Sequence, residues 1–123
     1  MITESYDKQT GIVAIVMTGT VTVDEYIEWT RTLTPGKISS RKLKLIVNGV
    51  KANYSFRPVE FLKIDQWISD LCTLFESVVI ARVHLRPKET AISEMADKRQ
   101  HPSNYITGMF TSQESAEQWL LER

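Results

Sequence analysis

The sequence predicts an α/β fold, with a mostly parallel sheet of about five strands, an N-terminal hairpin and about four helices. Short apolar runs, typical of buried strands, alternate along the chain with segments whose apolar residues recur every three or four positions, as in helices. Polar turns and helix-start patterns separate these segments. Strands that alternate with helices form parallel sheets with right-handed crossovers, so we expect residues 1–123 to form a single domain.

The chain opens with a predicted β-hairpin followed by a helix. Residues 2–7 alternate weakly, and a polar connection containing Gly11 leads to the apolar run IVAIVMTGTV. Such a run is expected of a strand covered on both faces. The first helix then opens at Thr22, with Glu25 three residues later in the capping-box pattern, and a Pro-Gly pair ends it.

Residues 42–50 form the third predicted strand, and the longest helix follows it. Pro58 suits the first turn of that helix. Trp67 and Leu74 widen its apolar stripe beyond what one packed face requires. The residues of the stripe itself are Phe61, Ile64, Ile68, Leu71 and Phe75.

The remaining segments continue the alternation of strands and helices. Residues 77–85 form the fourth strand, residues 87–99 a weaker helix and residues 105–110 the fifth strand. The final helix opens with Thr111 and Glu114 in a second capping-box pattern. Its inward residues are predicted to be Ala116, Trp119 and Leu120.

Composition narrows the classes of function. The 123 residues are 42% hydrophobic and 24% charged, proportions typical of soluble globular proteins. A formal net charge of zero argues against nucleic-acid binding, which needs a strongly basic face. One cysteine cannot form an internal disulfide, which favours a cytoplasmic setting. No apolar run approaches the roughly 20 residues of a membrane-spanning helix, so we expect at most peripheral membrane contact.

Three stretches of the chain fit the pattern of one known family: GIVAIVMTGTVTVDEY leading into the first helix, LKLIVNGV as the third strand, and the ending MFTSQESAEQWL. In their order and spacing they resemble the SpoIIAA-like family of the STAS superfamily, whose fold is related to CRAL-TRIO lipid-binding domains. The resemblance covers nearly the whole chain. It implies a scaffold that binds a lipid-like ligand or a protein partner.

The resemblance also raises the question of a phosphorylation switch. Anti-sigma-factor antagonists of the superfamily carry a phosphorylated serine, in an Asp-Ser-Ser-Gly-like sequence, where the third strand enters the second helix. Here Asn48 and Asn53 stand where acidic residues would be expected, and no glycine follows Ser55. We therefore expect no such switch. Ser55 suits a helix cap or turn first, an anionic ligand contact second, and phosphorylation third.

Motifs of known enzyme classes are absent, and we expect a protein that is not an enzyme and uses no cofactor or metal. The five glycines never cluster into a phosphate-cradling loop. The two histidines and Cys72 lack metal-ligand spacing. Cys72 lies beside the apolar stripe of the long helix, which favours a buried structural thiol over a nucleophile.

Basic residues mark the end of the predicted sheet where ligands usually bind. In open parallel sheets that place lies beyond the carboxyl ends of the strands. His84 and Arg86 approach this end of the fourth strand, and Lys51 and Arg57 follow the third strand. We expect these four residues to form one basic rim. The alternative is a solvated strand end whose basic side chains simply reach water.

Two functions follow from these observations. The first is a non-catalytic binding module for a lipid-like or other apolar-anionic small molecule, which an apolar cavity beneath the long helix would favour. The second is a protein–protein regulatory module that docks a partner or a second copy without a phospho-switch, which an exposed apolar patch would favour. The predicted ligand contacts are Lys51, Ser55, Arg57, Phe61, Trp67, His84 and Arg86.

Overall fold

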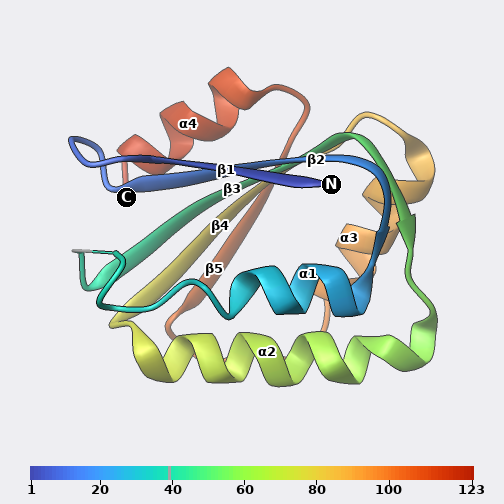
Figure 1. Cartoon of the computed structure of the whole chain (residues 1–123), viewed down its shortest axis with the longest axis horizontal. Helices are drawn as coiled ribbons and strands as arrows, with labels where there is room; N and C mark the ends of the chain where they lie inside the picture. Colours follow the sequence, from blue (N-terminus) through green and yellow to red (C-terminus); the bar gives the residue numbers. More distant parts are fainter. Residues whose placement is uncertain (39) are drawn as a thin grey trace.

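The computed structural model describes residues 1–38 and 40–123, and these form one five-stranded sheet with helices on both faces (Figure 1). The predicted α/β fold is confirmed. The strands are β1 (Ile2–Asp7), β2 (Ile12–Thr22), β3 (Lys42–Ser55), β4 (Ser77–Val83) and β5 (Tyr105–Phe110). The helices are α1 (Val23–Thr30), the 3₁₀ helix η1 (Pro58–Glu60), α2 (Phe61–Leu74), α3 (Pro87–Asp97) and α4 (Gln113–Leu121).

The strands lie side by side in chain order, β1-β2-β3-β4-β5. β1 and β2 form the predicted antiparallel hairpin, and each later pair is parallel. Gly11 turns the hairpin with a φ of 73°, a conformation that glycine adopts without a steric penalty. β3 is longer than the sequence predicts, because it continues to Ser55 along the second half of β2 after a register shift between Val16 and Thr18.

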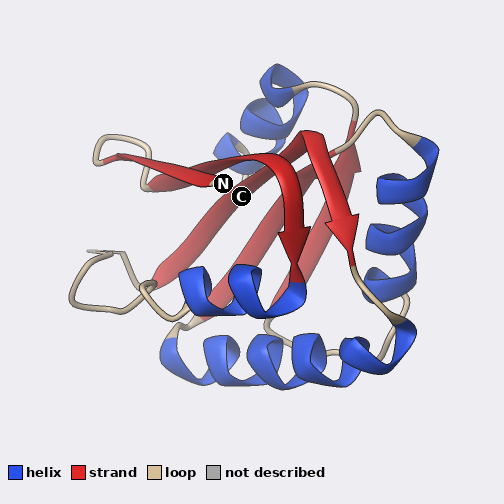
Figure 2. Cartoon of the chain, turned by 45° about the vertical axis from the view of Figure 1, so that its right-hand side comes forward, coloured by secondary structure: helices blue, strands red, loops and turns tan. Residues whose placement is uncertain are grey.

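The two faces of the sheet are covered unequally (Figure 2). The helices α1, α2 and α3 pack on one face, over the larger hydrophobic core. On the other face α4 packs alone, over a smaller core that includes Ile46, Val79 and Leu120. Successive residues of β3 and β4 therefore point into different cores, which explains why these strands read as almost continuous apolar runs.

The amino ends of α1 and α4 show whether the two predicted capping boxes form. The box at α1 is confirmed, since Glu25 N donates to Thr22 Oγ1 at 3.1 Å and Thr22 N donates to Glu25 Oε1 at 3.4 Å. The box predicted at Thr111 is wrong. Ser112 caps α4 instead, because its extended backbone lets Oγ accept from Ser115 N at 3.2 Å. Among the described residues, no helix combines the length and the apolar character needed to cross a bilayer.

Candidate functional site

A crevice lies beyond the carboxyl ends of β4 and β5. At this point the helices that follow the two strands lie on opposite faces of the sheet. After β4 the chain passes to α3, on the face that also carries α1 and α2, whereas after β5 it passes to α4 on the opposite face. Ligands of open α/β sheets bind at such a switch point. The crevice has a volume of about 690 Å³. Its lining residues are His84, Leu85, Pro87, Thr90, Ala91, Glu94, Met109, Phe110, Thr111 and Ser115.

The amino ends of α3 and α4 both border this crevice. α3 begins at Pro87, and among the described residues its N-cap Arg86 makes no side-chain capping bond. α4 begins after Ser112, and Ser115 of its first turn lines the crevice. Helix amino ends carry a partial positive charge and unpaired N–H groups. The crevice is therefore an environment that favours negative charge.

His84 forms the inner wall of the crevice and is 2% exposed. Its Nε2 lies 2.6 Å from the Tyr54 hydroxyl and 3.3 Å from Ser93 Oγ. Its Nδ1 is buried and has no partner among the residues that the structure describes. Burial, aided by the charge of Arg82, lowers the pKa of His84 to about 4 against an opposing effect of Glu89. The imidazole is therefore neutral at neutral pH.

The long β3 strand brings Tyr54 to His84. Tyr54 N donates to the buried carboxylate of Glu89 at 3.2 Å, which ties the end of β3 to the first turn of α3. Burial raises the pKa of Tyr54, so its phenol stays neutral and can donate to His84 Nε2. When Nε2 accepts, the ring hydrogen sits on Nδ1. The unpartnered Nδ1 of His84, a residue that lines the crevice, is then a buried hydrogen-bond donor.

Gly49 makes room for the pair of His84 and Tyr54. A Cβ built on Gly49 would overlap the Tyr54 hydroxyl and lie 2.8 Å from His84 Nε2. We expect Gly49→Ala to lower the free energy of unfolding by about 1–3 kcal/mol in denaturant titrations, a typical cost of overpacking. Gly36→Ala is the matched control, because a Cβ there would come no closer than 3.9 Å to Thr34 Oγ1 among the described atoms. Equal stability of the two variants would contradict this account.

Arg82 lies beneath His84 in a second buried polar cluster. Its Nε donates to Asp97 Oδ1 at 3.2 Å and its Nη2 donates to the Tyr105 hydroxyl at 3.1 Å. Thr107 Oγ1 donates to the other carboxylate oxygen of Asp97 at 3.1 Å. Burial alone would lower the pKa of Arg82, but the nearby oxygens of Tyr105 and Asp97 outweigh it and raise the pKa. The larger core thus contains a permanent positive charge.

A small space lies beside this cluster. An internal cavity of about 20 Å³ lies between the sheet and the three helices, enough for about one water molecule. Two buried donors without a partner among the described residues, the Tyr26 hydroxyl and Trp67 Nε1, border it. This cavity is too small to hold a lipid-like molecule. Its lining residues are Tyr26, Tyr54, Phe56, Ile64, Trp67, Arg82, Ile92, Ser93 and Ala96.

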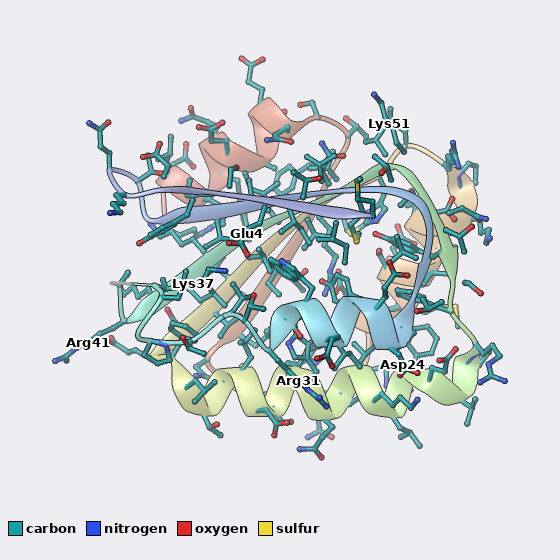
Figure 3. All side chains as sticks on the ribbon, viewed as in Figure 1. Glu4, Asp24, Arg31, Lys37, Arg41 and Lys51 are labelled. Atoms are coloured by element: carbon teal, nitrogen blue, oxygen red, sulfur yellow. The ribbon has the colours of Figure 1, made fainter. Side chains whose placement is uncertain are left out.

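The four residues of the predicted basic rim take different positions in the structure. His84 is at the expected strand end but is buried rather than exposed. Arg86 directs Nη1 to Ala52 O at 3.4 Å. Lys51 lies within β3 opposite Thr18, close to the bend of that strand in Figure 3. Arg57 pairs with Glu60 at 3.3 Å, and the extended chain from Lys51 to Arg57 spans up to about 20 Å at roughly 3.3 Å per residue.

The other predicted contacts take structural positions. Ser55 is exposed at the end of β3, opposite Thr22, so its expected role as a helix cap is wrong, and η1 is preceded by Arg57. Phe61 and Trp67 are each 6% exposed and belong to the larger core. Cys72 is buried, which raises the pKa of its thiol and agrees with a structural role.

Trp67 also lines a groove on the molecular surface between α1 and α2. This α1–α2 groove has a volume of about 550 Å³. It is separate from the crevice, because α1 and α2 contribute none of the residues that line the latter. Its lining residues are Asp24, Ile27, Thr30, Arg31, Leu33, Lys63, Gln66, Trp67, Asp70, Leu71 and Leu74.

Neither a metal-binding cluster nor similarity to known proteins helps to locate the site. In the part of the chain that the structure describes, no three His, Cys, Asp or Glu side chains are grouped so as to hold a metal ion. The sequence matches no protein-family model and no curated protein at a significant level. The case for the candidate site therefore rests on the crevice and on the buried His84 that forms its wall.

Proposed function

We propose that this protein is a non-catalytic binding module, and that its crevice binds a small molecule with an apolar body and one anionic group. The observation that carries the proposal is His84, which lines the crevice while its buried Nδ1 lacks a partner among the described residues. A buried polar atom without a partner costs about 1–3 kcal/mol. A ligand that accepts a hydrogen bond from Nδ1 removes this cost, which gives the site an intrinsic affinity for an acceptor.

The apolar part of the ligand contacts the side chains between the two helices. Leu85 is 58% exposed at the mouth of the crevice, and Ala91 and Met109 lie on its sides. Phe110 is held against Trp119, with ring centroids 5.3 Å apart, and so forms a firm wall. The crevice volume of about 690 Å³ falls in the range of about 300–1,000 Å³ usual for small-molecule sites.

The anionic part of the ligand is favoured by the charge distribution around the crevice. The amino ends of α3 and α4 both point their partial positive charge toward it. Glu94 supplies the one carboxylate among the described lining residues, and it lies in the third turn of α3 rather than at its amino end. A carboxylate, sulfonate or phosphate group can thus lie near the helix ends and accept from His84.

We propose no catalytic role because His84 has a low pKa and its Nε2 already has hydrogen-bond partners. Its pKa of about 4 makes it a weak base at neutral pH. Its Nε2 already contacts the Tyr54 hydroxyl, and Ser93, whose Oγ lies 3.3 Å from the same nitrogen, is 4% exposed and lines the internal cavity instead of the crevice. The pair of Ser93 and His84 therefore cannot deliver a nucleophile to a molecule in the crevice. A binding role also agrees with the resemblance to the SpoIIAA-like family.

A fluorescent probe with the proposed chemistry tests the site. Anilinonaphthalene sulfonate has an apolar aromatic body and one sulfonate, and its uncharged analogue phenylnaphthylamine lacks the anion. We expect the wild-type protein to bind the sulfonate more tightly than the analogue. Ala91 is exposed and lines the crevice, so Ala91→Glu should weaken sulfonate binding roughly tenfold by repulsion, whereas Ala91→Lys should not weaken it.

Two controls make the test specific to the crevice. Leu74→Glu alters the separate α1–α2 groove and should leave probe binding unchanged. Circular dichroism checks that each variant keeps the wild-type fold. Equal weakening by Ala91→Glu and Ala91→Lys would contradict the anionic preference. A wild-type protein that binds neither probe, or a loss of binding in Leu74→Glu alone, would contradict the crevice as the site.

A further inference from the structure

The α1–α2 groove has an apolar floor that is left open at the surface. Ile27 and Leu33 form one side of the floor, and Trp67, Leu71 and Leu74 form the other. Leu74 is 50% exposed, a large value for a leucine next to such a floor. Apolar surface gathered in one concave place, with charged residues around it, is typical of an interaction site.

The charged residues around the groove alternate in sign. α1 and α2 lie side by side and run in the same direction (Figure 1). At their amino ends, Asp24 of α1 meets Lys63 of α2 with a 3.0 Å ion pair. Seven residues further along the chain in each case, Arg31, which directly follows α1 and pairs with the exposed Glu28 at 3.3 Å, and Asp70 of α2 line the other end of the groove with the signs exchanged. Figure 3 shows Asp24 and Arg31 at the two ends of α1, on the side next to α2.

This arrangement of four charges is complementary to itself. Consider a second copy placed face to face by a two-fold axis that runs perpendicular to the helices. In this arrangement α1 lies antiparallel on α1 of the second copy, and Asp24 of one copy lies opposite Arg31 of the other. Lys63 then meets Asp70 in the same way. When the axis instead runs along the groove, α1 lies on α2 of the other copy, and each acid again meets a base. Both of these face-to-face arrangements therefore pair opposite charges, whereas a crossed arrangement about a diagonal axis would place like charges together and is disfavoured.

From this complementarity we propose that the occupant of the α1–α2 groove is a second copy of this chain, and that the protein forms a two-fold symmetric dimer through α1 and α2. Dimer formation covers the apolar floor and the exposed part of Leu74. The rim charges set the orientation of the two copies. The crevice at β4 and β5 lies outside this interface, so both copies keep an open crevice.

Sedimentation equilibrium over a range of protein concentrations tests the dimer. The wild-type protein should approach a mass twice that of the 14.1 kDa chain. Leu74→Glu places a charge on the apolar floor and should raise the dimer dissociation constant at least tenfold. Leu121→Glu is the matched control, since Leu121 is 48% exposed, much like Leu74, but belongs to α4 on the other face of the sheet. This control should dimerise like the wild type.

A charge variant tests the role of the rim. Arg31→Glu places a like charge opposite Asp24 in one arrangement and opposite Asp70 in the other, so it should weaken the dimer in both. Higher salt should reduce the difference from wild type, because it screens the repulsion. A wild-type chain that stays monomeric at every concentration, or equal dissociation constants for Leu74→Glu and Leu121→Glu, would overturn the proposal. An unchanged dissociation constant for Arg31→Glu would overturn the charge pairing on which it rests.

Discussion

Asp97→Ala should lower the free energy of unfolding by about 3–5 kcal/mol, because it leaves a buried guanidinium without its carboxylate. The side chain of Arg82 is 7% exposed, and Asp97 is its ion-pair partner at 3.2 Å. Without its partner, a buried charge still carries the full desolvation free energy, and no Coulomb attraction offsets it. The remaining hydrogen bond to the Tyr105 hydroxyl cannot replace a full negative charge. Urea or guanidinium titration of the variant gives the loss directly.

Two comparisons separate this effect from the simple loss of an ion pair. Asp24→Ala breaks the pair with Lys63, whose two side chains are 53% and 76% exposed, and should cost less than about 1 kcal/mol. The double variant Arg82→Met/Asp97→Leu removes both buried charges, and should recover much of the stability that Asp97→Ala loses. Similar losses for Asp97→Ala and Asp24→Ala would show that Arg82 finds other compensation.

The second large effect is a loss of stability in mild acid, which we assign to His84. Burial lowers the pKa of this histidine from 6.5 to about 4 in the folded protein. Between these two values the unfolded chain binds a proton that the folded chain excludes. The free energy of unfolding therefore falls as the pH falls from about 6.5 to about 4, by up to about 3 kcal/mol at roughly 1.4 kcal/mol per pKa unit. Below that window the loss is complete.

Denaturant titrations at a series of pH values measure this dependence. His84→Gln removes the titrating ring, so the variant should lose less stability than the wild type across the same window. His101→Gln, which removes the other of the two histidines, is the matched control substitution. The carboxylates of the chain titrate in all three proteins, and comparison of the slopes cancels their contribution. A slope for His84→Gln equal to that of the wild type would assign the acid sensitivity to other groups.

The fold could be predicted from local patterns because most elements are determined by nearby residues. The hairpin, α1 with its capping box, and the alternation of strands and helices needed no long-range information. The end of β3 could not be predicted in this way. The local pattern supports a strand over residues 42–50, but pairing with the second half of β2 carries it on to Ser55. That pairing joins segments about 30 residues apart in the chain, and no local pattern encodes it.

The candidate site was only partly predictable, for the same reason. Alternation along β4 placed Arg82 and His84 on the same face as Ile80, and the switch-point rule placed His84 near a binding crevice. Their burial depends on α3 and on the far end of β3, which supply Asp97, Ser93 and Tyr54. Nothing in the residues around His84 indicates those partners. The prediction of exposure is wrong for His84 alone, because α3 and the end of β3 cover it, whereas Lys51, Arg57 and Arg86 are exposed.

His84 belongs to the wall of the crevice and to the interior network at the same time, which has a consequence for how such a protein diverges in evolution. In the binding module that we propose, a change at His84 would alter ligand contact and stability together, because Tyr54 and Gly49 are fitted to its ring. Exposed wall residues such as Leu85 and Ala91 carry no such double role. Selection for a new ligand would therefore act first on these exposed positions, while the histidine and the glycine behind it persist in descendants that bind different molecules.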